Sequence, residues 1–398
     1  MKKILKYLRE NKILYIILII IALGFPTAVF KKAQGEQTTI VVAVGIDKKD
    51  GKYQVSIQSA NSLIKPMDSA KEAGGEEQKL EVIDGSGLSI SDAIHEIEIK
   101  TGRHLGFEHC HLIVMSDSVT SENCKSVLDF FYRKANITLG TYLISTDESA
   151  KTILDSTNKA QNTSINLLQQ NLGFNKTNYA SSNLKTLGDF FNEYYMASKT
   201  SSMAFLKTSS MEGVEGSVTQ NNGESAIFQN GKKVAVIDKN LTYGLNFVNL
   251  PKISGDMVLT GVNDDEIYKN ATVSVKIDEG EIKKTISVSP ESVTINLKIQ
   301  LKIEVLEVIN ENNYIGNNLG SENFLTETLK DEITKKVQTA IDDFHLYCKE
   351  NKIDACEFLS YLNAYKNSDY KNLTSTLTEE EILNRTKIST QIEIYCFR

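Results

Sequence analysis

An uncharged apolar run near the N-terminus constrains this chain most, because it predicts that everything after it folds on one side of a membrane. The run extends from Ile13 to Phe30. At about 1.5 Å per residue it approaches the roughly 30 Å thickness of the bilayer hydrocarbon. A basic flank precedes it, formed by Lys2, Lys3, Lys6, Arg9 and Lys12. Such a flank favours the cytoplasmic side, although Lys31 and Lys32 oppose it, so we expect the body outside the cytoplasm.

Cleavage as a signal peptide is the competing interpretation of this run. The residues Ala28-Val29-Phe30 end in a bulky side chain and do not form a small-x-small cleavage site. No cysteine that could accept a lipid occurs near the end of the run, where Leu23-Gly24-Phe25 stands. Retention is therefore favoured, and residues 1–34 are predicted to be a basic N-region and transmembrane anchor, with the membrane-spanning helix at 13–30.

Composition places the rest of the chain in the globular class. The 398 residues are 41% hydrophobic and 24% charged, and this length exceeds what one core usually serves, so two or three domains are expected. A net charge of -7 gives no basic field that would neutralise phosphates, so we expect no nucleic-acid partner. The five cysteines form no C-x-x-C pair, which argues against a zinc cage, and only Cys348 and Cys356 could pair, if the helix turns back between them.

Patterning in the first half predicts alternating strands and helices, which is typical of an α/β domain. The expected elements are a hairpin of Thr39–Ile46 and Tyr53–Ala60 around Asp50-Gly51, a strand at 80–83, a turn at 85–87, a helix from Ile90 that Ser89 and Asp92 cap and Gly102 ends, a strand at His111–Met115, a helix around Cys124–Phe131 and a strand at Ile137–Ser145.

The stretch from about 148 to 211 is rich in Ser, Thr, Asn and Lys, which predicts peripheral helices at Ile153–Leu168 and Leu187–Tyr195 and a linker. Its polarity favours partial disorder around 198–220. Beyond it, Ala226–Phe228 and Val234–Ile237 flank Asn230-Gly231, a pair that readily adopts a tight hairpin turn.

The last third carries the longest regular patterns. Apolar residues alternate with polar ones from Val293 to Val305, which predicts a long strand with one buried face. Steps of three or four residues from Leu325 to Phe344 predict a long amphipathic helix. Thr378 and Glu381 predict the capped start of a final helix, and Ile388–Phe397 a final strand.

The predicted fold class is therefore mixed α/β, or α+β, with an N-terminal transmembrane anchor followed by three small domains. We place an N-terminal α/β domain with peripheral helices at 35–200, a small β-rich middle domain at 201–284, and a C-terminal α/β domain with the long strand and the long helix at 285–398.

The most suggestive candidate site is Phe107-Glu108-His109-Cys110-His111. On a strand, His109 and His111 would share a face, and with His104 and Glu108 they could bind Zn²⁺ or Cu²⁺, but a tetrahedral site needs further ligands that the sequence does not locate. The favoured interpretation is structural, with one histidine packed at the start of a core strand and the other solvated. A nucleophilic pair of Cys110 with a histidine is disfavoured because neighbouring strand residues point to opposite faces.

Other polar motifs also have structural interpretations. Gly85-Ser86-Gly87-Leu88-Ser89 before a helix could hold an anion, but its spacing matches no phosphate-binding loop, and a turn with a cap is favoured. The acidic runs Asp264-Asp265-Glu266 and Glu379-Glu380-Glu381 lack the alternating oxygen ligands of a calcium loop, so solvated surface and a helix start are favoured. We assign no catalytic, cofactor-binding or metal-binding residue and expect no cofactor.

Four stretches, in this order, resemble the Ger(x)C family of spore germination proteins, and the resemblance covers nearly the whole chain. They are VVAVGIDKKDGKYQVSIQ; GLSISDAIHEIEIKTGRHLGFEHCHLIVMSDSV with FFYRK after it; SAIFQNGKKVAVIDKNLTYGLNFV; and ISVSPESVTINLKIQLKIEVLEV before the long helix. Each is a structural pattern rather than a catalytic motif. The chain departs from the family at Asp342–Cys348, where members usually carry a glycine-containing turn.

The resemblance implies a non-enzymatic C subunit of a nutrient-germinant receptor in the spore inner membrane. Its partners would be the polytopic A and B subunits of the same receptor, and its body would lie on the outer face as a scaffold or coupling component. Family members are typically lipoproteins with three mixed α/β domains, so the missing cysteine leaves the 13–30 helix to tether this chain. The alternative is a membrane-anchored extracytoplasmic small-molecule sensor. A hydrolase would need an acid, base or metal constellation that the sequence does not supply.

Overall fold

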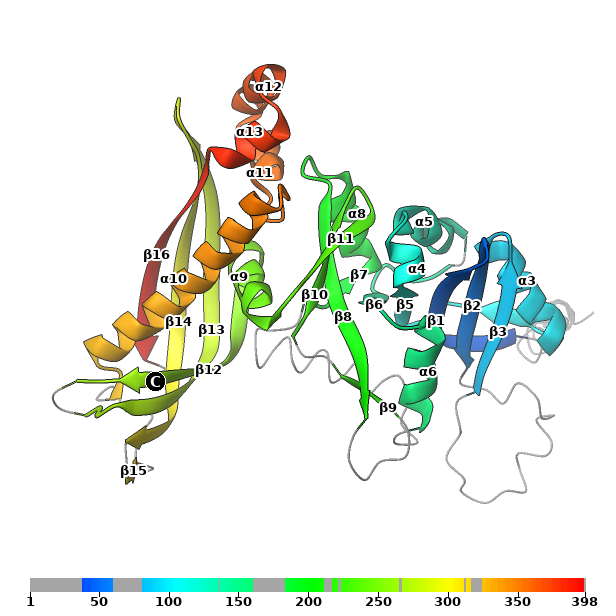
Figure 1. Cartoon of the computed structure of the whole chain (residues 1–398), viewed down its shortest axis with the longest axis horizontal. Coiled ribbons are helices and arrows are strands. Elements are labelled where there is room, and N and C mark those ends of the chain that lie inside the picture. Colours follow the sequence, from blue (N-terminus) through cyan, green and yellow to red (C-terminus); the bar gives the residue numbers. More distant parts are fainter. Residues whose placement is uncertain are drawn as a thin grey trace, which may run out of the picture.

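The computed structural model describes residues 38–59, 81–134, 136–159, 183–210, 217–220, 223–264, 267–310, 313–315 and 324–396. They form two β-sheets with packed helices, one in each half of an elongated molecule (Figure 1). The mixed α+β class is confirmed. The anchor predicted at 13–30 lies outside these residues, and within them no helix is long and apolar enough to span a bilayer.

The first sheet has four parallel strands at its centre and a pair of antiparallel strands on each side. Its main order is β11-β10-β8-β6-β5-β1-β2-β3, and β1, β5, β6 and β8 are the parallel strands. The bounds are β1 Thr38–Lys49, β2 Lys52–Ser59, β3 Glu81–Gly87, β5 Leu112–Ser116, β6 Tyr142–Thr146, β8 Thr200–Ser210, β10 Ser225–Gln229 and β11 Lys232–Ile237, with the short strands β4 His104–Gly106, β7 Lys185–Thr186 and β9 Ser217–Gln220 attached.

Both hairpins predicted for this half are confirmed. Asp50 and Gly51 turn between β1 and β2 with φ angles of 51° and 75°, and Asn230 and Gly231 turn between β10 and β11 with 53° and 77°. Positive φ at both turn positions matches the right-handed twist of the strands, which is why these residue pairs occur there.

Helices cover the two faces of the first sheet unequally. One face packs against α3 (Ile90–Thr101), α5 (Cys124–Lys134) and α8 (Leu187–Tyr195), and the other against α6 (Ala150–Lys159). The short helix α4 (Asp117–Thr120) follows β5. Ser89 and Gly102 cap α3 as predicted, and α8 has the predicted bounds. Residues 160–168 of the other predicted helix lie outside the described residues.

The predicted turn at 85–87 is wrong, because Gly85 and Gly87 belong to β3 and pair with Val55 and Tyr53. A Cβ atom added to Gly85 would lie 2.3 Å from the carbonyl oxygen of Ala93 in α3, and one added to Gly87 would lie 2.4 Å from the Ala93 nitrogen. These glycines therefore let the helix backbone lie directly on the strand.

Two further predictions in this half need correction. The strand predicted from Ile137 begins only at Tyr142, after a loop. Partial disorder predicted around 198–220 is wrong for Thr200–Ser210, which is β8, with Thr200–Leu206 buried in the sheet. Polarity misled the prediction, because Ser and Thr fit well in strands once neighbouring strands satisfy the backbone.

The second sheet is antiparallel apart from its last strand. It has the order β12-β13-β14-β15, and β16 pairs in parallel with β14. The bounds are β12 Lys252–Val262, β13 Ala271–Val288, β14 Val293–Asn310, β15 Asn313–Ile315 and β16 Thr386–Cys396. The strand predicted from Val293 to Val305 is confirmed as part of β14, and the predicted final strand as β16. The sequence did not predict β12 or β13.

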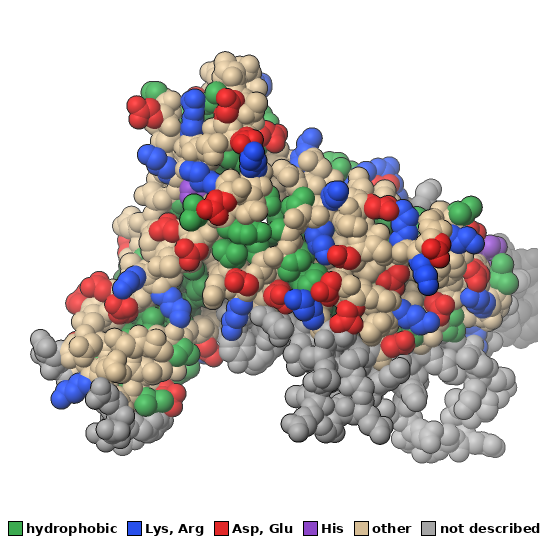
Figure 2. Space-filling model, viewed as in Figure 1, with side chains coloured by type: hydrophobic (Ala, Val, Ile, Leu, Met, Phe, Trp, Pro, Cys, Tyr) green, Lys and Arg blue, Asp and Glu red, His purple; other side chains and the backbone are tan. Residues whose placement is uncertain are grey.

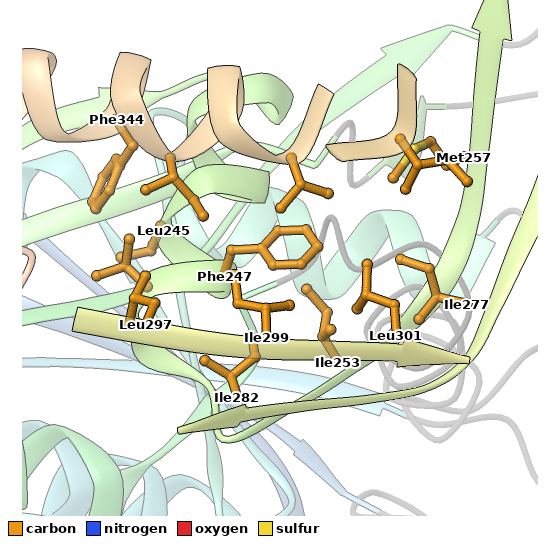
Figure 3. Packing of buried hydrophobic residues seen from close by; sticks show 14 of the residues in the cluster. Leu245, Phe247, Ile253, Met257, Ile277, Ile282, Leu297, Ile299, Leu301 and Phe344 are labelled. Atoms are coloured by element: carbon orange, nitrogen blue, oxygen red, sulfur yellow. The ribbon is translucent and has the colours of Figure 1, made fainter. Parts of the chain in front are cut away.

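Two helices cover one face of this sheet. The long helix α10 (Glu327–Glu350) confirms the predicted amphipathic helix and packs with α9 (Lys239–Asn249) over β13 and β14. Figure 3 shows Phe344 of α10 and Phe247 of α9 above Ile299 and Leu301 of β14. The helices α11 (Phe358–Tyr365), α12 (Asn367–Thr376) and α13 (Glu379–Asn384) stand at one end of the sheet (Figure 1), and Thr378 and Glu381 form the predicted capping box.

The predicted domain limits do not coincide with breaks between the sheets. The strands that follow residue 200, β8, β10 and β11, extend the first sheet. The limit after residue 284 falls within β13. The division into three domains, at 35–200, 201–284 and 285–398, remains a prediction.

Candidate functional site

The histidine-rich segment does not form the strand that a metal site there would need. The strand β5 begins at Leu112, so 107–111 is a loop, and His109 and His111 are both exposed instead of one being packed. Cys110 is buried, and its burial raises the pKa of the thiol to about 12. The described residues hold no group of three or more His, Cys, Asp or Glu side chains placed to bind a metal ion.

The acidic run at 379–381 lies at the start of α13, as predicted, whereas Asp264, predicted to be solvated surface, is half-buried and belongs to a turn. Asp264 accepts hydrogen bonds from the backbone nitrogens of Ile267 (2.7 Å) and Tyr268 (2.8 Å), which makes it a turn residue. The carboxylate of Glu381 caps the start of α13 through Thr378. Asp265 and Glu266 lie outside the described residues.

A polar crevice lies at the carboxyl ends of three parallel strands of the first sheet. It has a volume of about 580 Å³, and its walls are the ends of β1, β5 and β6 with the neighbouring parts of β2 and β3. The chain leaves β5 toward α5 on one face of the sheet and leaves β6 toward α6 on the other face. Such a switch in direction opens a crevice, and it is where open α/β sheets bind ligands.

Asp47 at the end of β1 holds the start of α6. Its carboxylate accepts hydrogen bonds from the backbone nitrogens of Ala150 (2.8 Å) and Lys151 (3.3 Å) and from the hydroxyl of Ser149 (2.9 Å). A negative charge there stabilises the helix N-terminus, whose free amides carry partial positive charge. The amides that could hold an anionic ligand are therefore already engaged.

Two lysines of the crevice are also engaged. The Lys151 ammonium lies 2.5 Å from a carboxylate oxygen of Asp84, and the Lys48 ammonium lies 2.5 Å from Glu122. The hydrogen bonds to these carboxylates raise the pKa values of Lys151 and Lys48. Both lysines therefore stay charged and hold the crevice walls together.

Lys233 connects the crevice to the strand β11. It pairs with Asp117, a crevice residue, and its ammonium lies 5.0 Å from the ring centre of Phe205. Burial lowers the pKa of Lys233 to about 8. The carboxylate of Asp117 after β5 is thereby linked to β11.

A second polar region, which we call the junction, joins the two halves. Ile227 and Ile237 of the first sheet pack in the hydrophobic core of the second half. Ser198 donates its backbone N–H to the hydroxyl of Ser360 in α11 (3.1 Å), and their hydroxyl oxygens are 2.7 Å apart. Figure 2 shows hydrophobic side chains gathered near the middle of the molecule, where the halves adjoin, and charges of both signs scattered over the rest of that face.

Lys284 of β13 holds the second-half side of the junction. Its ammonium donates to the carbonyl of Cys356 (2.8 Å) and to the side-chain oxygen of Asn249 (3.1 Å). It also lies 3.4 Å from Glu357 and 4.3 Å from the ring centre of Tyr361. One buried charge thereby ties α9, β13 and α11 together.

Glu193 and Lys185 hold the first-half side. They pair at 2.6 Å, and Glu193 also accepts a hydrogen bond from the backbone nitrogen of Ser202 at 3.3 Å. Burial raises the pKa of Glu193. Glu193 and Glu357 line one small void of about 10 Å³ between the halves, which is enough for one water molecule.

Cys348 and Cys356 lie beside this region, and the chain does turn back between them after α10. Their sulfur atoms are 3.9 Å apart, and both thiols are buried and free. Asp354 between them caps α11 by accepting from the nitrogens of Phe358 and Leu359, both at 2.8 Å. Burial raises the pKa of Asp354 to about 7.

Two family models match the chain. One, described as "Spore germination protein N-terminal domain", matches residues 32–208, and the other, "Spore germination B3/ GerAC like, C-terminal", matches residues 223–396. The chain belongs to the GerAC-like family of spore germination proteins. The resemblance to germinant receptor C subunits is thereby confirmed, and neither description names a catalytic activity.

One solved structure supports the fold of this GerAC-like chain. It is titled "Crystal Structure of the GerBC protein" and is similar with a TM-score of 0.53 at 14% identity, over 89% of this chain and 97% of that one. No curated protein matches. The N- and C-terminal family models meet between β8 and β10, which pair in one sheet, so the two family regions share the first sheet of this GerAC-like chain.

Sequence reasoning missed both polar regions of this GerAC-like chain. A signal for the crevice was present, because three polar clusters, Asp47-Lys48-Lys49, Ser116-Asp117-Ser118 and Asp147-Glu148-Ser149, each coincide with the end of a buried strand. The junction had no such signal. Lys284 and Glu357 are 73 residues apart and meet only because β13 and α11 pack together.

Proposed function

We propose that the chain is a non-enzymatic coupling subunit of a spore nutrient-germinant receptor. It is tethered by the helix at 13–30 to the spore inner membrane, with its body on the outer face, beside the polytopic A and B subunits. Membership of the GerAC-like family supports the receptor assignment. The predicted anchor supports the tether and its direction.

The observation that carries the coupling role is the junction. A displacement imposed on one half reaches the other only if the halves move as one body. A shared core and buried polar contacts join them, including Ser198 with Ser360. Packed interiors transmit displacement because they are dense and resist compression.

The receptor assignment is tested by fractionating spore membranes with an antibody against this protein. Strains with and without the polytopic partner genes are compared. We expect loss or degradation of the protein when the partners are absent, as for an obligate receptor subunit. Unchanged abundance and location would instead indicate a chain that works alone.

The coupling role is tested by loosening the junction without emptying its core. Combining Ser198→Ala with Ser360→Ala removes the hydroxyl contacts between the halves. We expect slower germination at unchanged protein abundance. The matched control is Ser375→Ala on the exposed helix α12, which should leave the rate unchanged. Normal germination of the double variant would contradict coupling through this region.

A second candidate function is a membrane-anchored small-molecule sensor, and the crevice is the observation that favours it. Its 580 Å³ falls in the size range of ligand sites. Calorimetric titration of the chain in detergent with nutrients that trigger germination tests this function. Saturable heat with one of them would favour a sensor, and heats of dilution alone would favour the coupling role.

A further inference from the structure

Cys348 and Cys356 differ from the other buried cysteines in what their sulfur atoms contact. The thiols of Cys110 and Cys124 each donate to a backbone carbonyl oxygen, at 3.4 and 3.1 Å. The sulfur atoms of Cys348 and Cys356 instead face each other at 3.9 Å. A free cysteine is commonly buried as a small apolar side chain. That tendency explains each cysteine by itself, but it gives no reason for two sulfur atoms to meet.

The turn after α10 sets the distance between the two sulfur atoms. Lys352 adopts a left-handed φ of 57°, and the N–H of Ile353 donates to the carbonyl of Cys348 (2.9 Å), so the chain folds back against the helix that it has just left. Asp354 fixes the other side of the turn by capping α11. Cys348 and Cys356 are only 3% and 1% exposed. The native fold therefore holds the two sulfur atoms beside each other.

This contact is close to what a disulfide requires. An S–S bond is about 2.05 Å long, and rotation of the two side chains about their Cα–Cβ bonds can span the remaining gap. We propose that Cys348 and Cys356 form a disulfide in the folded protein. The inference rests on the proposed function for one point, that the body lies outside the cytoplasm, where disulfides persist.

The bond forms by thiol–disulfide exchange with an oxidant that itself carries a disulfide. One cysteine thiolate attacks the oxidant, which forms a mixed disulfide and releases one thiol. The second cysteine thiolate attacks the mixed disulfide and releases the other thiol. The two cysteine sulfurs thus give two electrons to the oxidant, and their two protons go to the released thiols. Burial raises the pKa of the Cys356 thiol, so exchange should be fastest during folding, before the pair is enclosed.

The bond would strengthen the second-half side of the junction. The carbonyl of Cys356 already accepts from Lys284, and α11 carries the Ser360 hydroxyl that meets Ser198. A disulfide would join this segment covalently to the last turn of α10. Closing the loop also restricts the unfolded chain, so the oxidised protein should be the more stable form.

Peptide mapping of the protein recovered from spores tests the bond directly. Free thiols are blocked with N-ethylmaleimide in denaturant without reductant, and trypsin then separates the two cysteines into the peptides 337–349 and 353–366. We expect these peptides to be linked and the other three of the five cysteines to carry the label. Label on all five overturns the proposal. The spore fractionation described above tests the receptor assignment separately, so the two can fail independently.

A redox comparison of the purified full chain in detergent tests what the bond does. Samples are equilibrated in oxidised or in reduced glutathione, and their thermal midpoints are compared. Oxidation should raise the midpoint of the wild type by about 5 °C. The matched control Cys396→Ser, which removes a cysteine of β16, should show the same rise, and Cys348→Ser should show none.

Each variant is compared with its own reduced form, so lost packing in the Cys348 variant does not affect this difference. Equal midpoints for the oxidised and reduced wild type, or an undiminished rise in the Cys348 variant, would overturn the proposal.

Discussion

The crevice and the junction use the same chemistry at different depths. Each has a lysine paired with a carboxylate from a distant segment. In the crevice, the side chains of Lys151 and Asp84 are 43% and 44% exposed, whereas in the junction those of Lys284 and Glu357 are 6% and 19% exposed. Water screens an exposed pair, so it contributes little, but breaking a buried pair leaves a charge without water or partner. The crevice can therefore rearrange at small cost, and the junction cannot.

The largest effect we predict comes from Lys284→Ala in the junction. The variant leaves the Cys356 carbonyl, the Asn249 side chain and the Glu357 carboxylate without their shared donor. Breaking a buried pair of this kind costs about 3–5 kcal/mol. Urea denaturation should show the loss as a lower midpoint at an unchanged slope.

The neighbouring Lys283, which is exposed on the same strand, gives the matched control. Lys283→Ala should change the free energy of unfolding by less than about 0.5 kcal/mol. If both variants unfolded at the wild-type midpoint, the buried contacts of Lys284 in the junction would contribute no more to the free energy of unfolding than an exposed pair in the crevice.

A second prediction concerns pH, because the second half contains two groups, the buried Asp354 and the half-buried His345, whose pKa values are displaced in opposite directions. Burial raises the pKa of Asp354 from 3.8 to about 7. Native Asp354 therefore keeps its proton through this window while the unfolded chain loses it. The stability that it contributes is complete below pH 3.8 and declines as pH rises to about 7, by up to about 1.4 kcal/mol per pH unit.

His345 has the opposite slope. Burial lowers its pKa from 6.5 to about 4, and its Nε2 atom lies 2.8 Å from the Thr386 hydroxyl. Below pH 6.5 the imidazole of His345 binds a proton in the unfolded chain but not in the native chain. Stability is therefore lost as pH falls from 6.5 to about 4. In the wild type the two slopes partly cancel between pH 4 and 6.5.

Single variants should separate the two slopes. Asp354→Asn should leave a protein whose stability rises with pH across that window, and His345→Gln one whose stability falls more steeply than in the wild type. Urea midpoints at a series of pH values measure both. Parallel pH profiles for the wild type and the Asp354 variant would show that this carboxyl does not hold its proton in the native state.

The distance along the chain between interacting residues explains which features the sequence could predict. Turns and caps could be predicted, since Asn230-Gly231 and the Thr378–Glu381 box act through residues a few positions apart. The long strand could be predicted from the alternation between Val293 and Val305 for the same reason. The strand β13 was not predicted, although its residues from Ala271 to Ile277 alternate between buried and partly exposed positions, because glycine and charged residues interrupt its later course. Polar residues of β8 suggested disorder, because only the neighbouring strands show that their backbone is satisfied.

The two candidate regions also differ in whether the sequence marks their residues. The crevice is assembled from strand ends, and strand ends are marked in the sequence by polar residues after apolar ones. The junction depends on which helix packs on which sheet, and a single sequence carries no mark of that pairing. Nothing in the sequence therefore distinguishes Lys284 from the exposed lysines around it, although its side chain is only 6% exposed.

A third and smaller effect is predicted in the crevice for Asp47→Ala. The variant removes the carboxylate that accepts from the first amides of α6, a loss that costs about 1 kcal/mol at helix starts. Chemical denaturation measures it, and Asp47→Asn, which keeps one acceptor oxygen, should recover part of the loss. The control Asp256→Ala on β12 should have almost no effect. A cost as large as that of Lys284→Ala would place Asp47 among the structural groups that hold the fold.

The smallest effect should come from Lys151→Ala, which breaks the exposed pair with Asp84. We expect a cost below about 1 kcal/mol that shrinks further in high salt, since water and ions screen the pair. A double-mutant cycle with Asp84→Ala isolates the coupling between the two side chains, and the same cycle on Lys284 and Glu357 gives the junction value. A clearly larger coupling at the junction would show that burial, rather than the short distance of 2.5 Å in the crevice pair, decides which contact fixes the molecule. Equal coupling energies would remove the reason for assigning ligand binding to the crevice and the transmission of displacement to the junction.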